Sequence, residues 1–124
     1  MNFNNFTIKA QEAVQKAIDL AQAGNQQMIE PAHVLKGVML VGENVTNFLF
    51  QKLGVNVRNL ETVVDKEIES YPRVSGGEPM LSRETNAVFT KASDFASKMG
   101  DQFVSLEHLL LAIIKIVHTI RQCL

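Results

Sequence analysis

Apolar residues recur with a helical period near the start of the chain. Between residues 10 and 21 they stand at i, i+3, i+4, i+7, i+8 and i+11, which places them on one helix face. These residues are Ala10, Ala13, Val14, Ala17, Ile18 and Ala21. Thr7 precedes the pattern as a candidate N-cap and Gly24 follows it as a candidate stop, so we expect an amphipathic helix between them.

The same periodicity predicts three more helices before residue 71. One begins at Pro31, because proline is favoured at the first helical position, and it ends at Gly42. A third is expected to begin after Asn44 as its N-cap and to run through Leu53, and a fourth begins after Asn56. The apolar positions of this fourth helix are Val57, Leu60, Val64 and Ile68.

The helical pattern stops at residues 71–81, YPRVSGGEPML, where two prolines and a Gly-Gly pair predict a linker loop. Beyond it, Ser82 is the candidate N-cap of a helix that ends at Gly100, and Ser105 is the candidate cap of the next. The apolar positions of the helix after Ser82 are Val88, Ala92, Phe95, Ala96 and Met99.

The chain repeats itself with a shift of 75 residues, which aligns IEPAHVL with VSLEHLL and His33 with His108. The same shift places Thr7 on Ser82. The candidate N-caps, the apolar helix faces and the glycines that end the helices thus recur at equivalent positions in the two halves. The pattern predicts an all-α fold in which a four-helix motif is duplicated and packed with pseudo-twofold symmetry. We expect a first repeat at 1–70, a linker at 71–81 and an incomplete second repeat at 82–124, together forming one compact domain with a groove at the seam.

Composition narrows the possible functions. Hydrophobic residues make up 46% of the 124 residues, charged residues 20%, and the formal net charge is −1, as expected for one small globular domain. No basic run is present, which argues against nucleic acid or a membrane surface as a partner. The N-terminus has no secretory pattern and the single Cys123 allows no internal disulfide, so we expect a cytoplasmic protein.

Catalytic signatures are missing from the sequence. It contains no G-x-x-x-x-G-K-[ST] phosphate loop, no G-x-S-x-G and no H-E-x-x-H, which predicts a chain that is not an enzyme and needs no cofactor. His33 and His108 each stand at the start of a predicted helix. A metal would need further ligands, so we interpret both as structural histidines that donate a hydrogen bond to nearby backbone.

Three stretches together resemble a known family. They are FTIKAQEAVQKAIDLAQAGNQQMIEPAHVL, YPRVSGGEPMLS and MGDQFVSLEHLLLAI, and over residues 1–115 they are similar to the N-terminal domain of Clp-type ATP-driven chaperones, most of all the ClpB-type disaggregases. The resemblance implies a double-repeat domain tethered to two ATPase modules that assemble as a hexamer. In that family the domain engages unfolded or aggregated polypeptide, and in related chaperones it docks adaptor proteins.

The resemblance also implies a set of site residues, four polar and three lining an apolar groove. They are Thr7, Ser82, Asp101 and Glu107, and Ile8, Leu81 and Phe89. Five of them have a structural alternative: the hydroxyls as helix caps, the carboxylates as complements to a helix N-terminus, and Phe89 as a core residue. Relatives that recognise phosphorylated arginine carry a glutamate before both histidines, whereas here Glu107 has only Ala32 as its counterpart.

The tail departs from the family pattern. After Ile114 two more helices would be expected, but the chain reads KIVHTIRQCL, which we interpret as a truncated or frame-shifted end. On this interpretation apolar surface at 109–117 is less covered, which predicts reduced stability or self-association of an otherwise monomeric domain.

Three functions follow as hypotheses. The first is a substrate-binding module that weakly binds exposed apolar segments and passes them to an ATPase ring. The second is an adaptor-docking module that recognises a folded partner. The third, a helix-turn-helix DNA binder, is disfavoured by the net negative charge.

Overall fold

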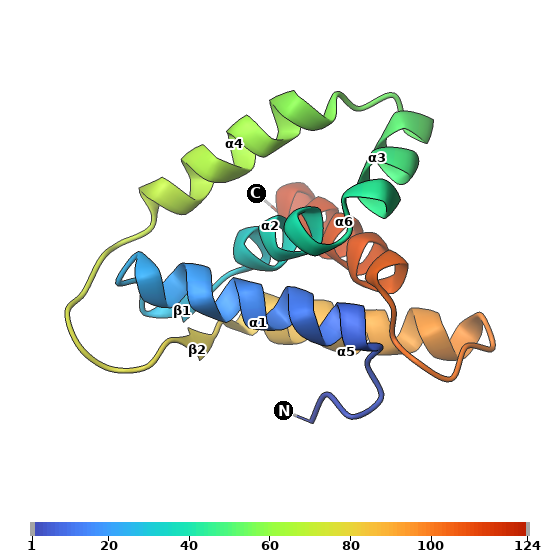
Figure 1. The fold of residues 1–124 in the computed structure, drawn as a ribbon, viewed down its shortest axis with the longest axis horizontal. Coiled ribbons are helices and arrows are strands. Elements are labelled where there is room, and N and C mark those ends of the chain that lie inside the picture. Colours follow the sequence, from blue (N-terminus) through green and yellow to red (C-terminus); the bar gives the residue numbers. More distant parts are fainter. Residues whose placement is uncertain (1, 124) are drawn as a thin grey trace.

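The computed structural model describes residues 2–123, with side chains up to Val117, and confirms the all-α fold. Within this range six helices and two short strands follow one another along the chain (Figure 1). The elements are α1 (Ile8–Ala23), β1 (Met28–Ile29), α2 (Pro31–Val41), α3 (Glu43–Lys52), α4 (Val57–Ser70), β2 (Met80–Leu81), α5 (Arg83–Lys98) and α6 (Leu106–Cys123). No helix in this range combines the length and apolar character needed to cross a bilayer.

Two helix pairs make up the body of the fold. Helix α1 packs on α2, α5 packs on α6, and α2 also contacts α4 and α6, so that α2 lies at the centre. The α1 stripe is built largely from alanines that are fully buried, and their small side chains let α1 approach α2 closely. At the crossing, a Cβ added to Gly37 would lie 2.3 Å from the carbonyl oxygen of Ala13, so only glycine fits there.

The two halves of the chain are joined at two places by backbone hydrogen bonds. At one end β1 and β2 pair in parallel: the Met80 N–H donates to the Gln27 carbonyl (2.9 Å) and the Ser82 N–H to the Ile29 carbonyl (3.1 Å). At the other end, the Thr7 N–H donates to the Val104 carbonyl at 2.9 Å. Because Met80 and Leu81 form a strand, the linker loop is shorter than predicted.

Three predicted N-caps are confirmed. The side-chain oxygens of Thr7, Asn56 and Ser82 each accept a hydrogen bond, at 3.1 Å, from the backbone N–H three residues later. Asn44 is not a cap, and that prediction was wrong. Helix α3 begins at Glu43, directly after Gly42, which joins it to α2. A Cβ on Gly42 would lie 2.4 Å from Leu106 Cδ1, so the side chain of Leu106 packs directly against this turn.

Candidate functional site

Four of the seven predicted site residues lie at one end of the molecule. Thr7 and Ile8 begin α1, and Asp101 and Glu107 lie in the loop before α6 and in its first turn. The hydrogen bond from Thr7 to Val104 holds these segments together, since Val104 stands between the two acidic residues along the chain. We call this region the α1 end.

An apolar hollow of about 360 Å³ opens beside the α1 end. It is lined by Phe3, Ile8, Gln11, Glu12, Val14, Gln15 and Ile18. Among the large apolar side chains that the structure describes, Ile8 is the most exposed, with 76% of its surface accessible. Phe3 stacks edge-to-face on Phe89 at 5.2 Å, and Phe89 is itself only 1% exposed. Phe89 therefore lies in the core beneath the hollow, and its side chain does not line an exposed surface.

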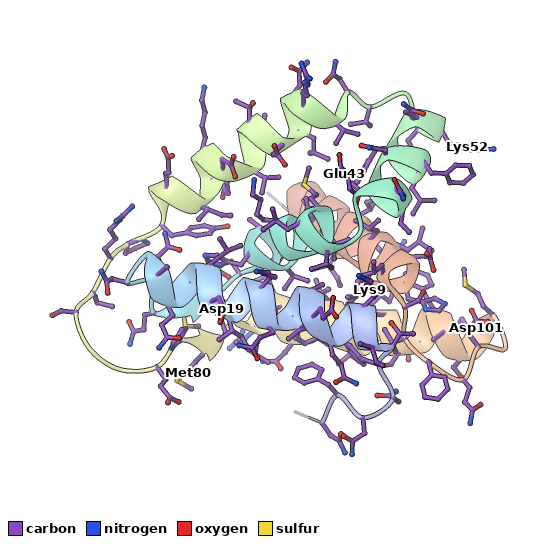
Figure 2. The ribbon with its side chains drawn as sticks, viewed as in Figure 1. Lys9, Asp19, Glu43, Lys52, Met80 and Asp101 are labelled. Atoms are coloured by element: carbon purple, nitrogen blue, oxygen red, sulfur yellow. The ribbon has the colours of Figure 1, made fainter. Side chains whose placement is uncertain are left out.

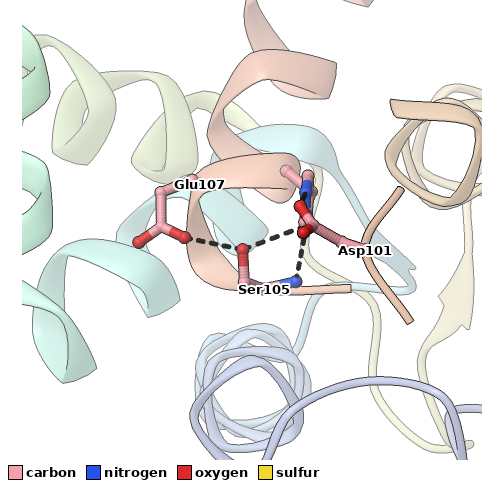
Figure 3. Close-up of polar contacts among 4 residues, drawn as sticks. Asp101, Ser105 and Glu107 are labelled. Carbon is pink, nitrogen blue, oxygen red and sulfur yellow. Dashed lines mark hydrogen bonds and ion pairs between the residues drawn. The ribbon is translucent and has the colours of Figure 1, made fainter. Parts of the chain in front are cut away.

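A polar cluster forms the acidic side of the α1 end (Figure 3). The Ser105 hydroxyl donates to a Glu107 carboxylate oxygen (2.7 Å), and the Ser105 N–H donates to Nδ1 of His108 (2.9 Å). On the other side of the ring, Nε2 of His108 lies 2.9 Å from a carboxylate oxygen of Asp101. These contacts fix both carboxylates while leaving them in reach of solvent, with the Asp101 side chain 53% exposed.

The first half of the chain contains the same ring geometry with an uncharged partner. The Glu30 N–H donates to Nδ1 of His33 (2.9 Å), and Nε2 of His33 lies 2.6 Å from the amide oxygen of Gln26. Both histidines thus accept a hydrogen bond from the backbone, which corrects the predicted direction. His33 is fully buried, and burial lowers its pKa to about 4.

Of the other three, Phe89 lies beneath the hollow, whereas Leu81 and Ser82 lie at the opposite end. Leu81 belongs to β2, and Ser82 is 2% exposed, with its hydroxyl donating to Thr85 Oγ1 at 2.9 Å. Figure 2 places Met80, the neighbour of Leu81, far from Asp101. Since α1 spans 16 residues, the α1 end and the strand pair are separated by roughly 24 Å. The structure therefore does not bring the seven residues into one site.

A larger hollow lies at the predicted seam, but none of the seven residues lines it. This seam groove has a volume of about 480 Å³ and lies among α2, α4, α6 and the first turn of α5. Its lining is Glu30, Pro31, Ala32, Leu35, Leu60, Val63, Val64, Glu67, Tyr71, Glu84, Ile113 and Val117. In the sequence, its α4 wall is a row of positions at i, i+3, i+4 and i+7 from Leu60 to Glu67, but this spacing alone does not indicate a groove.

Charge at the seam groove is negative. Burial raises the pKa of Tyr71, and the nearby carboxylates of Glu67 and Glu30 raise it further. Glu84 adds a third carboxylate from α5. Among the residues whose side chains the structure describes, no Lys or Arg lines the groove or pairs with these glutamates.

Exposure along the start of α6 is mixed. Leu109, Leu110 and Ile113 are buried, whereas Leu111 and Ile114 are each about 40% exposed. The side chains after Val117, including that of Cys123, lie outside the described residues.

Comparison with known proteins gives a consistent result. The model of the Clp repeat (R) N-terminal domain family matches residues 5–124. The chaperone protein ClpB of Bacteroides thetaiotaomicron is 64% identical over 120 residues, which cover 97% of this chain and 14% of that protein. ClpB of Porphyromonas gingivalis is 56% identical over 114 residues, covering 92% of this chain and 13% of the relative. The chain thus spans about one seventh of the length of these curated relatives.

Solved structures share the fold at lower identity. The Hsp104 N-terminal domain from Candida albicans superposes with a TM-score of 0.80 and 21% identity, covering 96% of this chain and 81% of that one. The N-terminal domain of the ClpV1 ATPase from E. coli gives a TM-score of 0.84 and 22% identity, covering 94% and 71% of the two chains.

Proposed function

Because this chain belongs to the Clp repeat N-terminal domain family, we propose that it is the polypeptide-binding module of a ClpB-type disaggregase. The domain is a non-catalytic module of the family. It binds exposed apolar segments of unfolded or aggregated polypeptides and passes them to an ATPase ring formed by other parts of the protein.

The observation that carries this proposal is the exposed Ile8 beside an apolar hollow with two fixed carboxylates at the same end. An apolar side chain that is 76% exposed gains favourable free energy whenever a second apolar group covers it. Asp101 and Glu107 add attraction for Lys or Arg next to the bound apolar residues. The α1 end therefore selects for apolar residues flanked by basic ones.

Binding at this site is expected to be weak. The hollow is shallow and open to solvent, so a single contact has a dissociation constant in the micromolar range or above, about −8 kcal/mol or weaker. Weak contacts let a segment be released toward the ring. Several tethered copies in a hexamer compensate by raising the effective concentration.

An NMR titration with a reduced and alkylated, permanently unfolded polypeptide tests the proposal. We expect amide shifts to cluster at Thr7, Ile8 and Asp101, and Ile8→Ser to weaken binding by roughly threefold to tenfold. Leu53→Ser is the matched control, because Leu53 is also exposed but directly follows α3 and lines neither hollow. Equal binding of the folded form of the same polypeptide would contradict the proposal.

Adaptor docking is the second candidate, and the polar cluster favours it. The hydrogen bonds from Ser105 and His108 hold Glu107 and Asp101 in set positions, as suits recognition of a defined folded surface. A stoichiometric complex with a folded partner that unfolded polypeptide does not displace, and that Asp101→Asn weakens, would support this function over the first.

A further inference from the structure

The seam groove is a second, separate hollow. It opens between α4 and α6 with α2 as its floor, and it shares no lining residue with the hollow at the α1 end. We propose that it binds an amphipathic helix of a partner protein that carries Lys or Arg beside its apolar face.

The walls of the groove have the form that a third helix needs. Leu60, Val63, Val64 and Glu67 follow one row along α4 at i, i+3, i+4 and i+7. Ile113 and Val117 form a matching i, i+4 row on α6. The two rows flank a channel. The apolar face of another helix can pack into this channel by the ridges-into-grooves arrangement usual between helices.

Apolar side chains at the rim of the groove are exposed to solvent, whereas those at its bottom are buried. Leu35, Val64 and Ile113 are buried at the bottom, whereas Val63 is 61% exposed and Val117 36% exposed at the top. A helix in the channel would remove these two valines from water. Covering this apolar surface favours association, against the entropic cost of binding.

Charge decides what kind of helix fits. Glu30 and Glu67 line the groove together with Tyr71, and Glu84 lines it from α5. With no Lys or Arg of the described side chains beside them, these carboxylates leave a negative rim above an apolar floor. A ligand helix with Lys or Arg bordering its Leu or Val positions matches both parts, and an acidic helix is repelled.

A designed peptide provides the test. The probe is a fluorescently labelled helix of leucine and lysine, 14 residues long to match α4, with leucines at i, i+3, i+4 and i+7. Its partner probe has glutamate in place of every lysine. We expect the lysine peptide to bind, with affinity that falls as salt is raised, and the glutamate peptide to fail to bind.

Two pairs of variants locate the peptide. Val63→Asp should weaken binding roughly tenfold, while Leu53→Asp, at an equally exposed position outside the groove, should not. Glu67→Lys should weaken it roughly threefold to fivefold, while Glu69→Lys, with the same charge change on the same helix, should not. Circular dichroism establishes that each variant is folded, and the Ile8→Ser variant should bind the peptide normally.

Two results would overturn the proposal. Equal affinity for all four variants would place the peptide elsewhere on the domain. A concentration-dependent dimer that forms without peptide and is abolished by Val63→Asp would mean that a second copy of the chain, not a basic helix, occupies the groove. Neither result bears on the α1 end, which the Ile8→Ser variant tests independently.

Discussion

Lowering the pH from 7 to 5 is expected to destabilise the domain through His33. The Nε2–H of this buried ring faces the amide oxygen of Gln26, and its Nδ1 accepts the Glu30 N–H. Both ring nitrogens are satisfied by the neutral form. Burial removes the ring from water, which disfavours its charged form and lowers the pKa of His33 to about 4. A second proton on Nδ1 would also take the place of the hydrogen bond from the Glu30 N–H.

The sign and size follow from linkage. Unfolded His33 takes up a proton near pH 6.5, whereas the folded ring does so only near pH 4. Between these values the unfolded state binds more protons, so the free energy of unfolding falls as the pH falls. The loss between pH 7 and pH 5 is about 2 kcal/mol, out of about 3 kcal/mol over the full window.

Urea denaturation followed by circular dichroism at pH 7, 6 and 5 measures the change in the free energy of unfolding, and the Gln26→Glu variant isolates the part due to His33. NMR of the His33 ring gives its pKa directly. Gln26→Glu places a carboxylate at Nε2 and should raise that pKa and reduce the loss, whereas Gln27→Glu, at an exposed neighbouring position, should change neither. A His33 pKa between 6 and 7, or an unfolding free energy that does not change between pH 7 and 5, would refute the reasoning.

Further substitutions test the packing, each by urea denaturation. Gly37→Ala should lower stability by about 2 kcal/mol or more, since overlap with the Ala13 carbonyl outweighs a helix-propensity gain of about 1 kcal/mol; a stabilised variant would contradict the close crossing. Ser82→Ala should cost about 1 to 2 kcal/mol, because it removes a buried cap and a hydroxyl hydrogen bond to Thr85, and no change would exclude this role. Phe89→Ala should cost about 3 to 5 kcal/mol through loss of core packing, whereas a loss below 1 kcal/mol would mean that the site collapses around the cavity.

The helices could be predicted because their signals are local. Each amphipathic stripe depends on residues within one helix, and the caps at Thr7, Asn56 and Ser82 act over three residues. The pairing of β1 with β2 has no such signal. Each strand is two residues long, too short for any periodicity, and the pairing depends on how the two halves come together.

The candidate site was predictable only in part for a similar reason. Thr7 and Ser82 occupy equivalent places in the two halves, but α1 and α5 run in opposite directions, so equivalent places lie at opposite ends. The seam groove depends on α2, α4, α5 and α6 at once. Nothing within the sequence of α4 indicates that Val63 stays uncovered while its neighbour Val64 is buried, because that depends on where α6 lies.

The hydrogen bonds that join the halves also have a consequence for folding kinetics. Thr85 Oγ1 donates to the Ile29 carbonyl across 56 residues of chain, and closing a loop of that length costs about 3.5 kcal/mol in chain entropy. The α1–α2 and α5–α6 pairs need only short loops, so we expect them to form first and the joining of the halves to limit the folding rate. Because hydrogen bonds join the two halves at both ends, one half cannot unfold without breaking hydrogen bonds to the other half. We therefore expect unfolding to be cooperative.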